Sequence, residues 1–151
     1  MSIMNQFTNN YLQSIVYIDD NINYGTAVIN TDNWIQPDTD DDIVKMTTHI
    51  ANVFSAALLK SSSIGQSQFD VIVLLDKFKV KNINYKFVKY LTSILKQLFP
   101  DKLRKATLID PPRYFVTAYD IIKTFLDKPT RKKFHLISSS TQSELYADDL
   151  S

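Results

Sequence analysis

The sequence predicts an α/β fold with a mostly parallel sheet and helices packed on it. Short runs of branched and aromatic residues alternate with segments of about 15 residues whose apolar positions recur at helical spacing. Residues 69–75 form a largely apolar, branched run, which is typical of a strand covered on both faces. Strands that alternate with helices of this length usually pair in parallel. At 151 residues, the chain predicts one domain over residues 1–151.

The first half of the chain predicts two short strands and one long helix. The strands are residues 14–18 and 26–30, joined through Asp, Asn and Gly turn residues. The acidic run 38–42 predicts a helix start, capped by its first residue or by Thr39, because carboxylates favour the positive end of a helix. This helix is expected to run to about Lys60. Its predicted buried face consists of Ile43, Met46, Ile50, Val53, Phe54, Ala57 and Leu58.

The second half predicts two further helices between strands. A helix over residues 84–99 ends at Pro100, since proline cannot continue a helix. A strand at 105–109 leads through Pro111-Pro112 into a third helix, and residues 133–137 form the next strand. Residues 141–150 predict a last short helix. The second helix is expected to bury Phe87, Val88, Leu91, Leu95 and Leu98, and the third to bury Phe115, Ala118, Tyr119, Ile122, Phe125 and Leu126.

Common catalytic and cofactor motifs are absent from the sequence. Gly25 and Gly65 are its only glycines, so neither a phosphate-binding loop nor a dinucleotide fingerprint can form. The sequence has no cysteine, which excludes disulfides and thiolate metal sites. His49 and His135 are each interpreted as structural. Asp76 follows a predicted strand, where α/β folds place functional carboxylates, but it suits a turn equally well. We therefore expect a protein that is not an enzyme and uses no metal or cofactor.

Charge is distributed unevenly along the chain. Residues 1–76 carry nine Asp and two Lys, a net charge of −7. Residues 77–136 carry twelve Lys, three Arg and four Asp, a net charge of +11, and residues 137–151 carry −3. The basic segment predicts an anionic partner, either nucleic acid, a membrane surface or a phosphorylated ligand. The alternative is that the lysines only solvate exposed helix faces.

Location is predicted from what the sequence lacks. No run approaches the roughly 20 apolar residues of a membrane span, and the N-terminus does not resemble a signal peptide. Together with the absence of cysteine, this makes the cytosol the expected compartment. The high content of Ile, Asn and Lys resembles proteins from AT-biased genomes, such as those of large viruses or parasites.

Several motifs in the second half follow one another in a recognisable order. Asp76 ends a strand, Phe99-Pro100-Asp101-Lys102 ends a helix, and Asp110-Pro111-Pro112 ends the next strand. Phe125-Leu126-Asp127, Thr130 and Lys133-Phe134 follow the third helix. With this pattern, residues 69–145 resemble the second half of a CRAL-TRIO lipid-binding domain, the module of phosphatidylinositol transfer proteins and of tocopherol and retinal carriers. The spacing matches without a gap from Pro100 to Lys133, and residues 24–29 resemble the family's opening strand.

The resemblance implies an apolar pocket that takes a single lipid, with the sheet as its floor and residues 114–126 as a gate helix. It also implies a headgroup site of Asp101 and Lys133, with Lys102 and Thr130 as neighbouring contacts. A lysine amine suits a phosphate, and a carboxylate accepts hydrogen bonds from inositol hydroxyls. The implied ligand is phosphatidylinositol or a phosphoinositide, taken up at an anionic membrane surface. The gate and pocket residues would be Tyr114, Phe115, Tyr119, Ile122, Phe125 and Leu126.

The chain departs from the family pattern at several positions. The family's N-terminal three-helix region is expected to be missing, because few residues precede the first predicted strand. Arg104 occupies the position of a glycine in the hinge of the gate, and Asp101 replaces a glutamate. Val71 and Val73 replace hydroxyl residues that bind phosphatidylcholine in the yeast type, which argues against phosphatidylcholine exchange. The pocket is expected to be small, open, or completed by a second chain in a homodimer.

The leading hypothesis is a non-enzymatic lipid-binding or lipid-transfer protein that favours phosphatidylinositol or phosphoinositides and docks on membranes from the cytosol. The main alternative is a protein-interaction module that binds a small GTPase or signalling protein, which fits an incomplete pocket. Nucleic-acid binding is disfavoured, because the lysines are spread along helix faces without Arg forks or an aromatic stacking platform.

Overall fold

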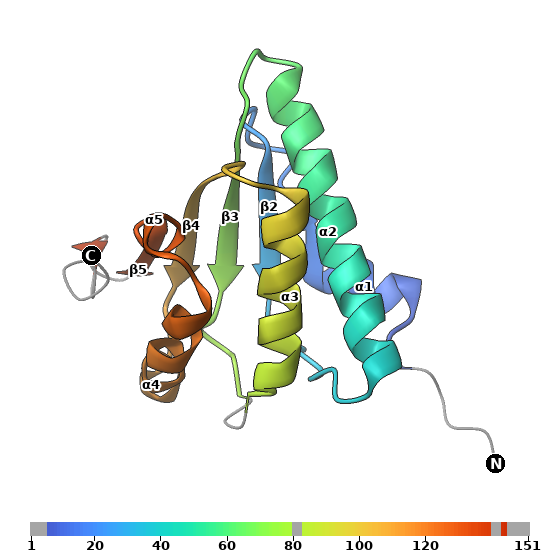
Figure 1. Cartoon of the computed structure of the whole chain (residues 1–151), viewed down its shortest axis with the longest axis vertical. Coiled ribbons are helices and arrows are strands. Elements are labelled where there is room, and N and C mark those ends of the chain that lie inside the picture. The colour runs from blue at the N-terminus through green and yellow to red at the C-terminus, as the bar shows by residue number, and fades with distance from the viewer. Residues whose placement is uncertain (1–5, 80–82, 140–142, 145–151) are drawn as a thin grey trace.

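The computed structural model describes residues 6–79, 83–139 and 143–144. It confirms the α/β class, with strands and helices alternating over most of the chain (Figure 1). In chain order the elements are α1 Asn9–Ile15, β1 Val16–Ile18, β2 Thr26–Asn30, α2 Asp40–Ser62, β3 Phe69–Leu74, α3 Tyr85–Leu98, β4 Leu103–Ile109, α4 Arg113–Ile122, the 3-10 helix η1 Lys123–Phe125, α5 Lys128–Arg131, β5 Phe134–Ser138 and β6 Ser143–Glu144.

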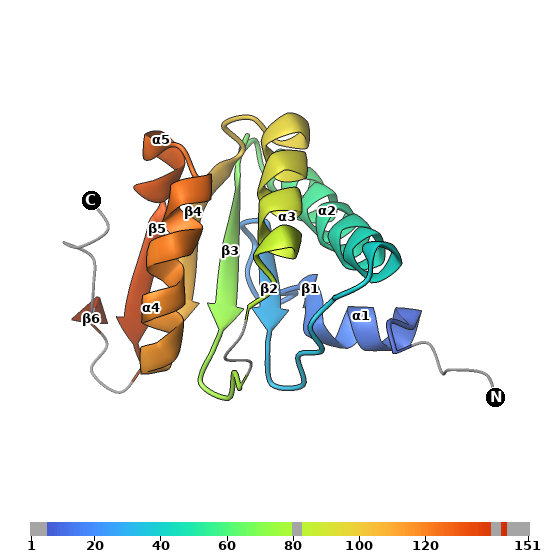
Figure 2. The same cartoon turned by 60° about the horizontal axis from the view of Figure 1, so that its bottom comes forward.

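The described strands form one sheet in the order β1-β2-β3-β4-β5-β6. β2, β3, β4 and β5 pair in parallel, whereas β1 and β6 pair antiparallel with their neighbours. Parallel neighbours need a crossover connection, and such connections are almost always right-handed. Because the parallel strands follow one another in a single direction across the sheet, crossovers of one hand place their helices on one face. Figure 2 shows α2, α3 and α4 together in front of the sheet.

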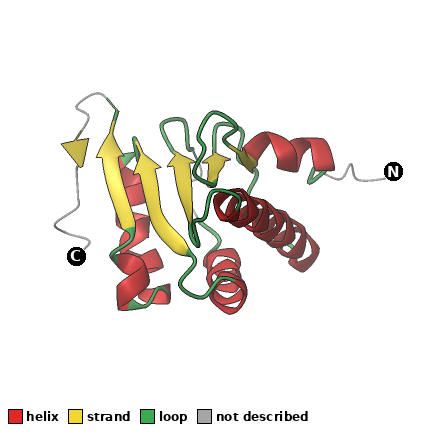
Figure 3. Ribbon diagram, turned by 90° about the horizontal axis from the view of Figure 1, so that it is seen from above, coloured by secondary structure: helices red, strands yellow, loops and turns green. Residues whose placement is uncertain are grey.

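The opposite face of the sheet, which we call the outer face, is crossed by no helix of the described residues (Figure 3). Strand positions alternate between the two faces, so core residues such as Val71 and Leu108 point toward the helices and their neighbours point away. The prediction that residues 69–75 are covered on both faces is therefore wrong, because the single hand of the crossovers leaves one face without helices. The outer face carries five apolar side chains that lie outside the core cluster: Val28, Ile72, Leu74, Ile109 and Ile137.

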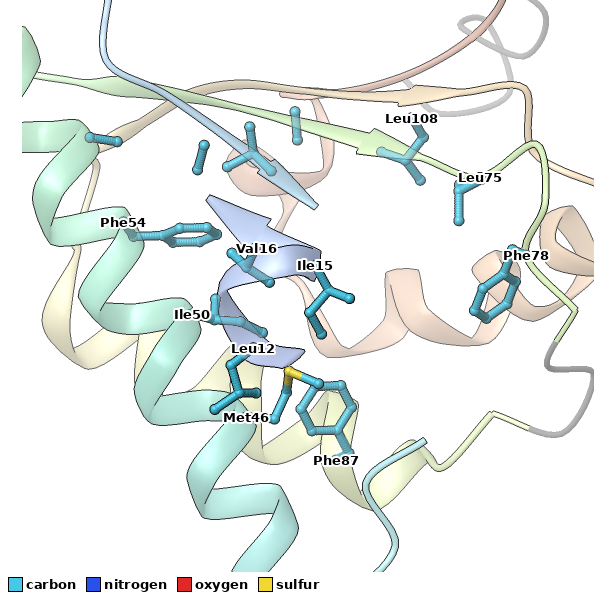
Figure 4. Close-up of a cluster of buried hydrophobic side chains, with 14 of the residues drawn as sticks. Leu12, Ile15, Val16, Met46, Ile50, Phe54, Leu75, Phe78, Phe87 and Leu108 are labelled. Atoms are coloured by element: carbon cyan, nitrogen blue, oxygen red, sulfur yellow. The ribbon is translucent and has the colours of Figure 1, made fainter. Parts of the chain in front are cut away.

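α2 has the N-terminus and the buried face that the sequence predicts. Thr39 caps it, with its Oγ1 accepting a hydrogen bond from the amide of Asp42 at 3.1 Å, and three aspartates occupy the first turn. Its buried residues are Ile43, Met46, Thr47, Ile50, Phe54, Ala57 and Ser61, while the predicted Val53 and Leu58 are half-buried. Figure 4 shows Met46 beside Leu12 of α1 and Phe87 of α3. These three helices therefore share one core.

The sequence pattern does not predict α1. Thr8 caps this helix, with its Oγ1 accepting from the amide of Tyr11 at 3.2 Å. Leu12 and Ile15 are buried in the core. A helix of seven residues is too short to show a helical apolar repeat, and it runs directly into β1. The predicted strand 14–18 therefore merges the end of a helix with a strand.

The third helix is shorter than predicted. α4 ends at Ile122 and tightens into η1, so the prediction of a continuous helix over 114–126 is wrong beyond Ile122. The Oγ1 of Thr124 donates to the carbonyl of Ile121 at 2.6 Å, a local bond that competes with the regular helical pattern. Lys128–Arg131 is a helical turn, capped by Asp127, whose carboxylate accepts from the amide of Thr130 at 2.9 Å.

Two further predictions need correction. Ser143–Glu144 is a strand paired with β5, so these two residues are not part of a helix over 141–150. The other residues of that predicted helix lie outside the described residues. Leu98 is 57% exposed, because the next residue, Phe99, takes the inward position against the rings of Phe54 and Phe69. In the part of the chain that the structure describes, every helix is too short or too polar to span a bilayer.

Candidate functional site

Of the three crossover helices, α3 buries the smallest share of its residues. In α3, Phe87 is the one buried residue, although the apolar side of this helix is long. Among the crossover helices, α2 also makes the most close backbone approaches to the sheet. The apolar residues of α3 and α4 that touch the core but keep part of their surface exposed include Val88, Leu91, Leu95, Tyr114, Val116 and Ile122. An apolar ligand between these helices would therefore bury surface that the protein alone leaves partly exposed.

The predicted gate residues lie along α4 and η1. Phe115 and Tyr119 are buried, whereas Tyr114, Ile122, Phe125 and Leu126 are half-buried. At the start of α4, the hydroxyl of Tyr114 donates to the carbonyl of Phe78, and the two rings stack with centroids 6.4 Å apart. In η1, the ring of Phe125 contacts the ring of Tyr85 edge-on at 6.4 Å. α4 is thus tied to the loop after β3, and η1 reaches across to the start of α3.

Thr130 and Lys133 lie together at the turn between α5 and β5. The amide of Lys133 donates to the carbonyl of Thr130 at 3.0 Å. The carboxylate of Asp127 caps α5 at Thr130, and hydrogen bonds from the side chain and the amide of Thr130 lower the pKa of Asp127. The charges of Lys96 and Lys133 lower that pKa further. A cation of α3 and one just before β5 therefore both act on this carboxylate.

Asp101 and Lys102 lie in the turn between α3 and β4. Asp101 has a positive φ of 58°, which Asp tolerates better than most residues, and its carbonyl accepts from Nε2 of Gln68 at 3.1 Å. The carbonyl of Lys102 accepts from the amide of Phe69 at 2.9 Å. These contacts hold the turn against the start of β3. The side chain of Asp101 is exposed.

The four predicted headgroup residues therefore form two pairs at one edge of the sheet, where β4 and β5 begin. Among the described residues, no hydrogen bond or ion pair joins Asp101 to Lys133. Sequence reasoning missed two neighbouring cations, Lys96 and Arg131. Lys96 is exposed and belongs to no motif of the sequence, and Arg131 lies in a connection whose helical turn the sequence pattern did not predict.

Arg104, at the position of the family's hinge glycine, is held in place by three side-chain contacts. Its Nε donates to Oδ1 of Asp70 at 2.9 Å, and its Nη2 donates to Oδ2 at 2.5 Å. Its guanidinium lies 3.7 Å from the centre of the Tyr24 ring. The hydrogen bonds that Arg104 donates to Asp70 raise the pKa of Arg104. This residue ties β4 to β3, so it cannot act as a flexible hinge.

The structure also has a hollow that the sequence did not predict. It lies between α1 and α2, has a volume of about 490 Å³, and is lined by Phe7, Thr8, Asn9, Leu12, Val44, Lys45, Thr48, His49 and Asn52. The structural role predicted for His49 is supported by its contact with β1. Its Nε2 lies 2.9 Å from the carbonyl oxygen of Val16, which links α2 to β1. Within the described ranges, no three His, Asp or Glu side chains are grouped as metal ligands.

Comparisons with known proteins show the family and the fold of the chain. The model of the CRAL/TRIO domain matches residues 13–148. The Sec14 cytosolic factor of Schizosaccharomyces pombe is 34% identical over 61 residues, and the phosphatidylinositol transfer protein SFH5 of Candida glabrata is 36% identical over 59 residues. These alignments cover 40% and 39% of this chain but only 21% and 20% of the two relatives.

A solved structure extends the similarity to most of the fold. The crystal structure of Sfh5 superposes with a TM-score of 0.68 at 18% identity, covering 85% of this chain and 49% of that one. At this identity the superposition shows the fold, while the match of the domain model over residues 13–148 shows the family. The resemblance identified from the sequence motifs is therefore confirmed, and the chain belongs to the CRAL/TRIO domain family.

Proposed function

We propose that this chain binds one phospholipid, phosphatidylinositol or a phosphoinositide, and carries it between membranes without chemical reaction. The observation that carries this proposal is the set of half-buried apolar residues on α3 and α4, in a fold whose β4 and β5 begin beside Lys102, Thr130 and Lys133. An acyl chain would lie between the two helices, and the polar headgroup would meet the edge where β4 and β5 begin. Relatives that carry out phosphatidylinositol transfer support this choice of ligand.

The proposed headgroup site has a division of roles. Lys133 and Lys102 would contact phosphate oxygens, because charge-assisted hydrogen bonds to phosphate are strong. Thr130 would add a hydroxyl contact, and Asp101 would accept hydrogen bonds from inositol hydroxyls. For Asp101 and Lys133 to contact one ligand, the headgroup would have to bridge the two pairs of residues, which a ligand larger than a single phosphate can do.

The first experiment is to identify lipids extracted from the purified protein by mass spectrometry, and then to measure its binding to liposomes with and without phosphoinositides. Phosphatidylinositol at one molecule per chain, or binding that depends on phosphoinositide, would support the proposal. A protein that carries no lipid and binds neither type of liposome would contradict it.

Replacing Lys133 with alanine should lower affinity for phosphoinositide liposomes by roughly tenfold or more, because one charge-assisted hydrogen bond is lost. Lys89→Ala is the matched control, because it removes the same charge from an exposed lysine of α3. Both variants should keep the circular dichroism spectrum of the wild type. Equal affinity of the two variants for phosphoinositide liposomes would remove Lys133 from the site.

Docking on anionic membranes through the basic segment 77–136 should depend strongly on salt. Each basic residue near an anionic surface contributes about 1 kcal/mol. This attraction falls off over one Debye length, which becomes shorter as salt is added. Binding to anionic liposomes should therefore fall steeply between about 0.05 M and about 0.5 M NaCl. Binding that is unchanged over this range would show that the segment of net charge +11 does not drive docking.

A second candidate function, protein interaction, is favoured by the outer face of the sheet. Its five apolar side chains lie outside the core, and no helix of the described chain crosses them. Val28 is buried and the other four side chains are half-buried, and apolar patches that keep some exposed surface often mark interaction surfaces. A partner protein recovered with a lipid-free chain, and lost when Ile72 is replaced with lysine, would favour this function. A second copy of the chain is one such partner, which sedimentation would detect.

A further inference from the structure

Tyr119 of α4 carries a buried hydroxyl that has no hydrogen-bond partner among the described residues. The residue is only 2% exposed, and its ring lies against the rings of Phe115 and Phe134. A phenylalanine would fill the same space without burying an unpaired polar group. Because buried hydroxyls are nearly always paired, an unpaired one suggests a partner that the protein alone does not provide.

Two cations lie close to this tyrosine. The Nζ of Lys123 is 5.8 Å from the centre of the Tyr119 ring and 3.3 Å from Oδ1 of the exposed Asp120, and the Lys123 side chain is only 21% exposed. Arg131 of α5 acts on the hydroxyl electrostatically: burial raises the pKa of Tyr119, and the positive charge of Arg131 opposes that rise. The hydroxyl therefore stays protonated at neutral pH and can donate a hydrogen bond. A neutral donor beside two cations suits an anionic oxygen.

We infer that the hydroxyl of Tyr119 donates a hydrogen bond to a phosphate oxygen of the ligand, with Arg131 and Lys123 as its electrostatic support. The inference rests on the proposed function, because the ligand must enter beneath α4. The hydroxyl is enclosed in the present arrangement, so α4 or η1 must shift for the contact to form. The phosphate belongs either to a phospholipid or to a water-soluble inositol phosphate.

The same hydroxyl should then affect the free and the bound protein in opposite directions. In the ligand-free protein it is a buried group without a partner, which lowers stability. In the bound protein it is paired with a charged acceptor, which raises affinity. A residue with a purely structural role would not combine these two effects.

The test compares Tyr119→Phe with Tyr11→Phe. The hydroxyl of Tyr11 is fully used, since it donates to the carbonyl of Asn33 at 3.1 Å and accepts from the amide of Ile35 at 2.6 Å. Urea unfolding is measured for each ligand-free protein. Binding is measured to phosphatidylcholine vesicles that contain phosphatidylinositol, and to soluble glycerophosphoinositol. Tyr119→Phe should raise the urea midpoint and weaken vesicle binding about tenfold or more, whereas Tyr11→Phe should lower the midpoint and leave affinity unchanged.

The outcomes separate this inference from the proposed function. If the wild type binds the vesicles and Tyr119→Phe binds them equally well, the inference is overturned and lipid binding stands. A lower urea midpoint for Tyr119→Phe would show that the hydroxyl already has a partner, which also overturns it. If the wild type binds neither probe, both proposals fail. A loss of affinity for vesicles alone assigns the phosphate to a membrane lipid, and an equal loss for the soluble compound assigns it to the headgroup as such.

Discussion

Replacing Gly25 with alanine should lower the free energy of unfolding by about 3 kcal/mol or more. A Cβ at this position would lie 1.7 Å from the carbonyl oxygen of Ala57 and 2.5 Å from Oγ of Ser61. The clash is with the backbone of α2, which cannot move without disturbing the core around Met46 and Phe54. The amide of Gly25 would also lose its hydrogen bond to Oγ of Ser61, now 2.9 Å long. Urea unfolding followed by circular dichroism measures the effect.

Gly65→Ala is the matched control for this prediction. Gly65 has a positive φ of 78°, but no atom lies within 4 Å of an added Cβ. Its replacement should therefore cost only the strain of a left-handed backbone, about 1–2 kcal/mol. If Gly25→Ala were no more destabilising than Gly65→Ala, the close approach of α2 to the start of β2 would be incorrect.

Replacing Arg104 with leucine should destabilise the protein by about 2–3 kcal/mol, because it leaves a buried carboxylate without its partner. Asp70 is 5% exposed, and both of its carboxylate oxygens accept from Arg104. Arg104→Lys should recover only part of the loss, since lysine cannot make the two-pronged contact or stack as well on Tyr24. Thermal and urea unfolding of the purified variants measure these differences.

A second substitution tests whether the loss of stability comes from the unpaired Asp70 or from the change at residue 104 itself. Asp70→Leu combined with Arg104→Leu removes the unpaired charge, so the double variant should be more stable than Arg104→Leu alone. Lys86→Leu is the surface control: Lys86 pairs with Asp40 at 2.7 Å, but both side chains are largely exposed, so little change is expected. A double variant as unstable as Arg104→Leu would show that the unpaired carboxylate of Asp70 is not the cause of the lost stability.

The sequence alone was sufficient for the fold class and for most elements. Their signals are local: aspartates and a capping threonine at the start of α2, helical spacing of its apolar residues, and prolines before and after β4. The ordered motifs from Pro100 to Lys133 were also sufficient for the family, because their spacing is a property of the chain. Features that depend on local chemistry and on spacing along the chain can be predicted without the tertiary structure.

Some of the predictions that failed depend on contacts between distant residues, and others on local features that a helical repeat does not reveal. Whether residues 69–75 are covered on one face or two depends on the hand and direction of all crossovers together. α1 is too short to show a period of its own, and the length of α4 depends on a local hydrogen bond at Thr124. Likewise, Phe99 rather than Leu98 packs against the core because Phe54 and Phe69 lie beside it in space.

The candidate site shows the same division. The residue types that suit a phosphoinositide, Asp101, Lys102, Thr130 and Lys133, could be named from sequence motifs. Only the tertiary structure shows that they lie as two separate pairs, that the charge of Lys96 acts on Asp127, and that the hydroxyl of Tyr119 is buried without a partner among the described residues. Spacing along the chain determines which residues a segment carries, whereas burial and pairing are determined by segments that meet only in the folded protein.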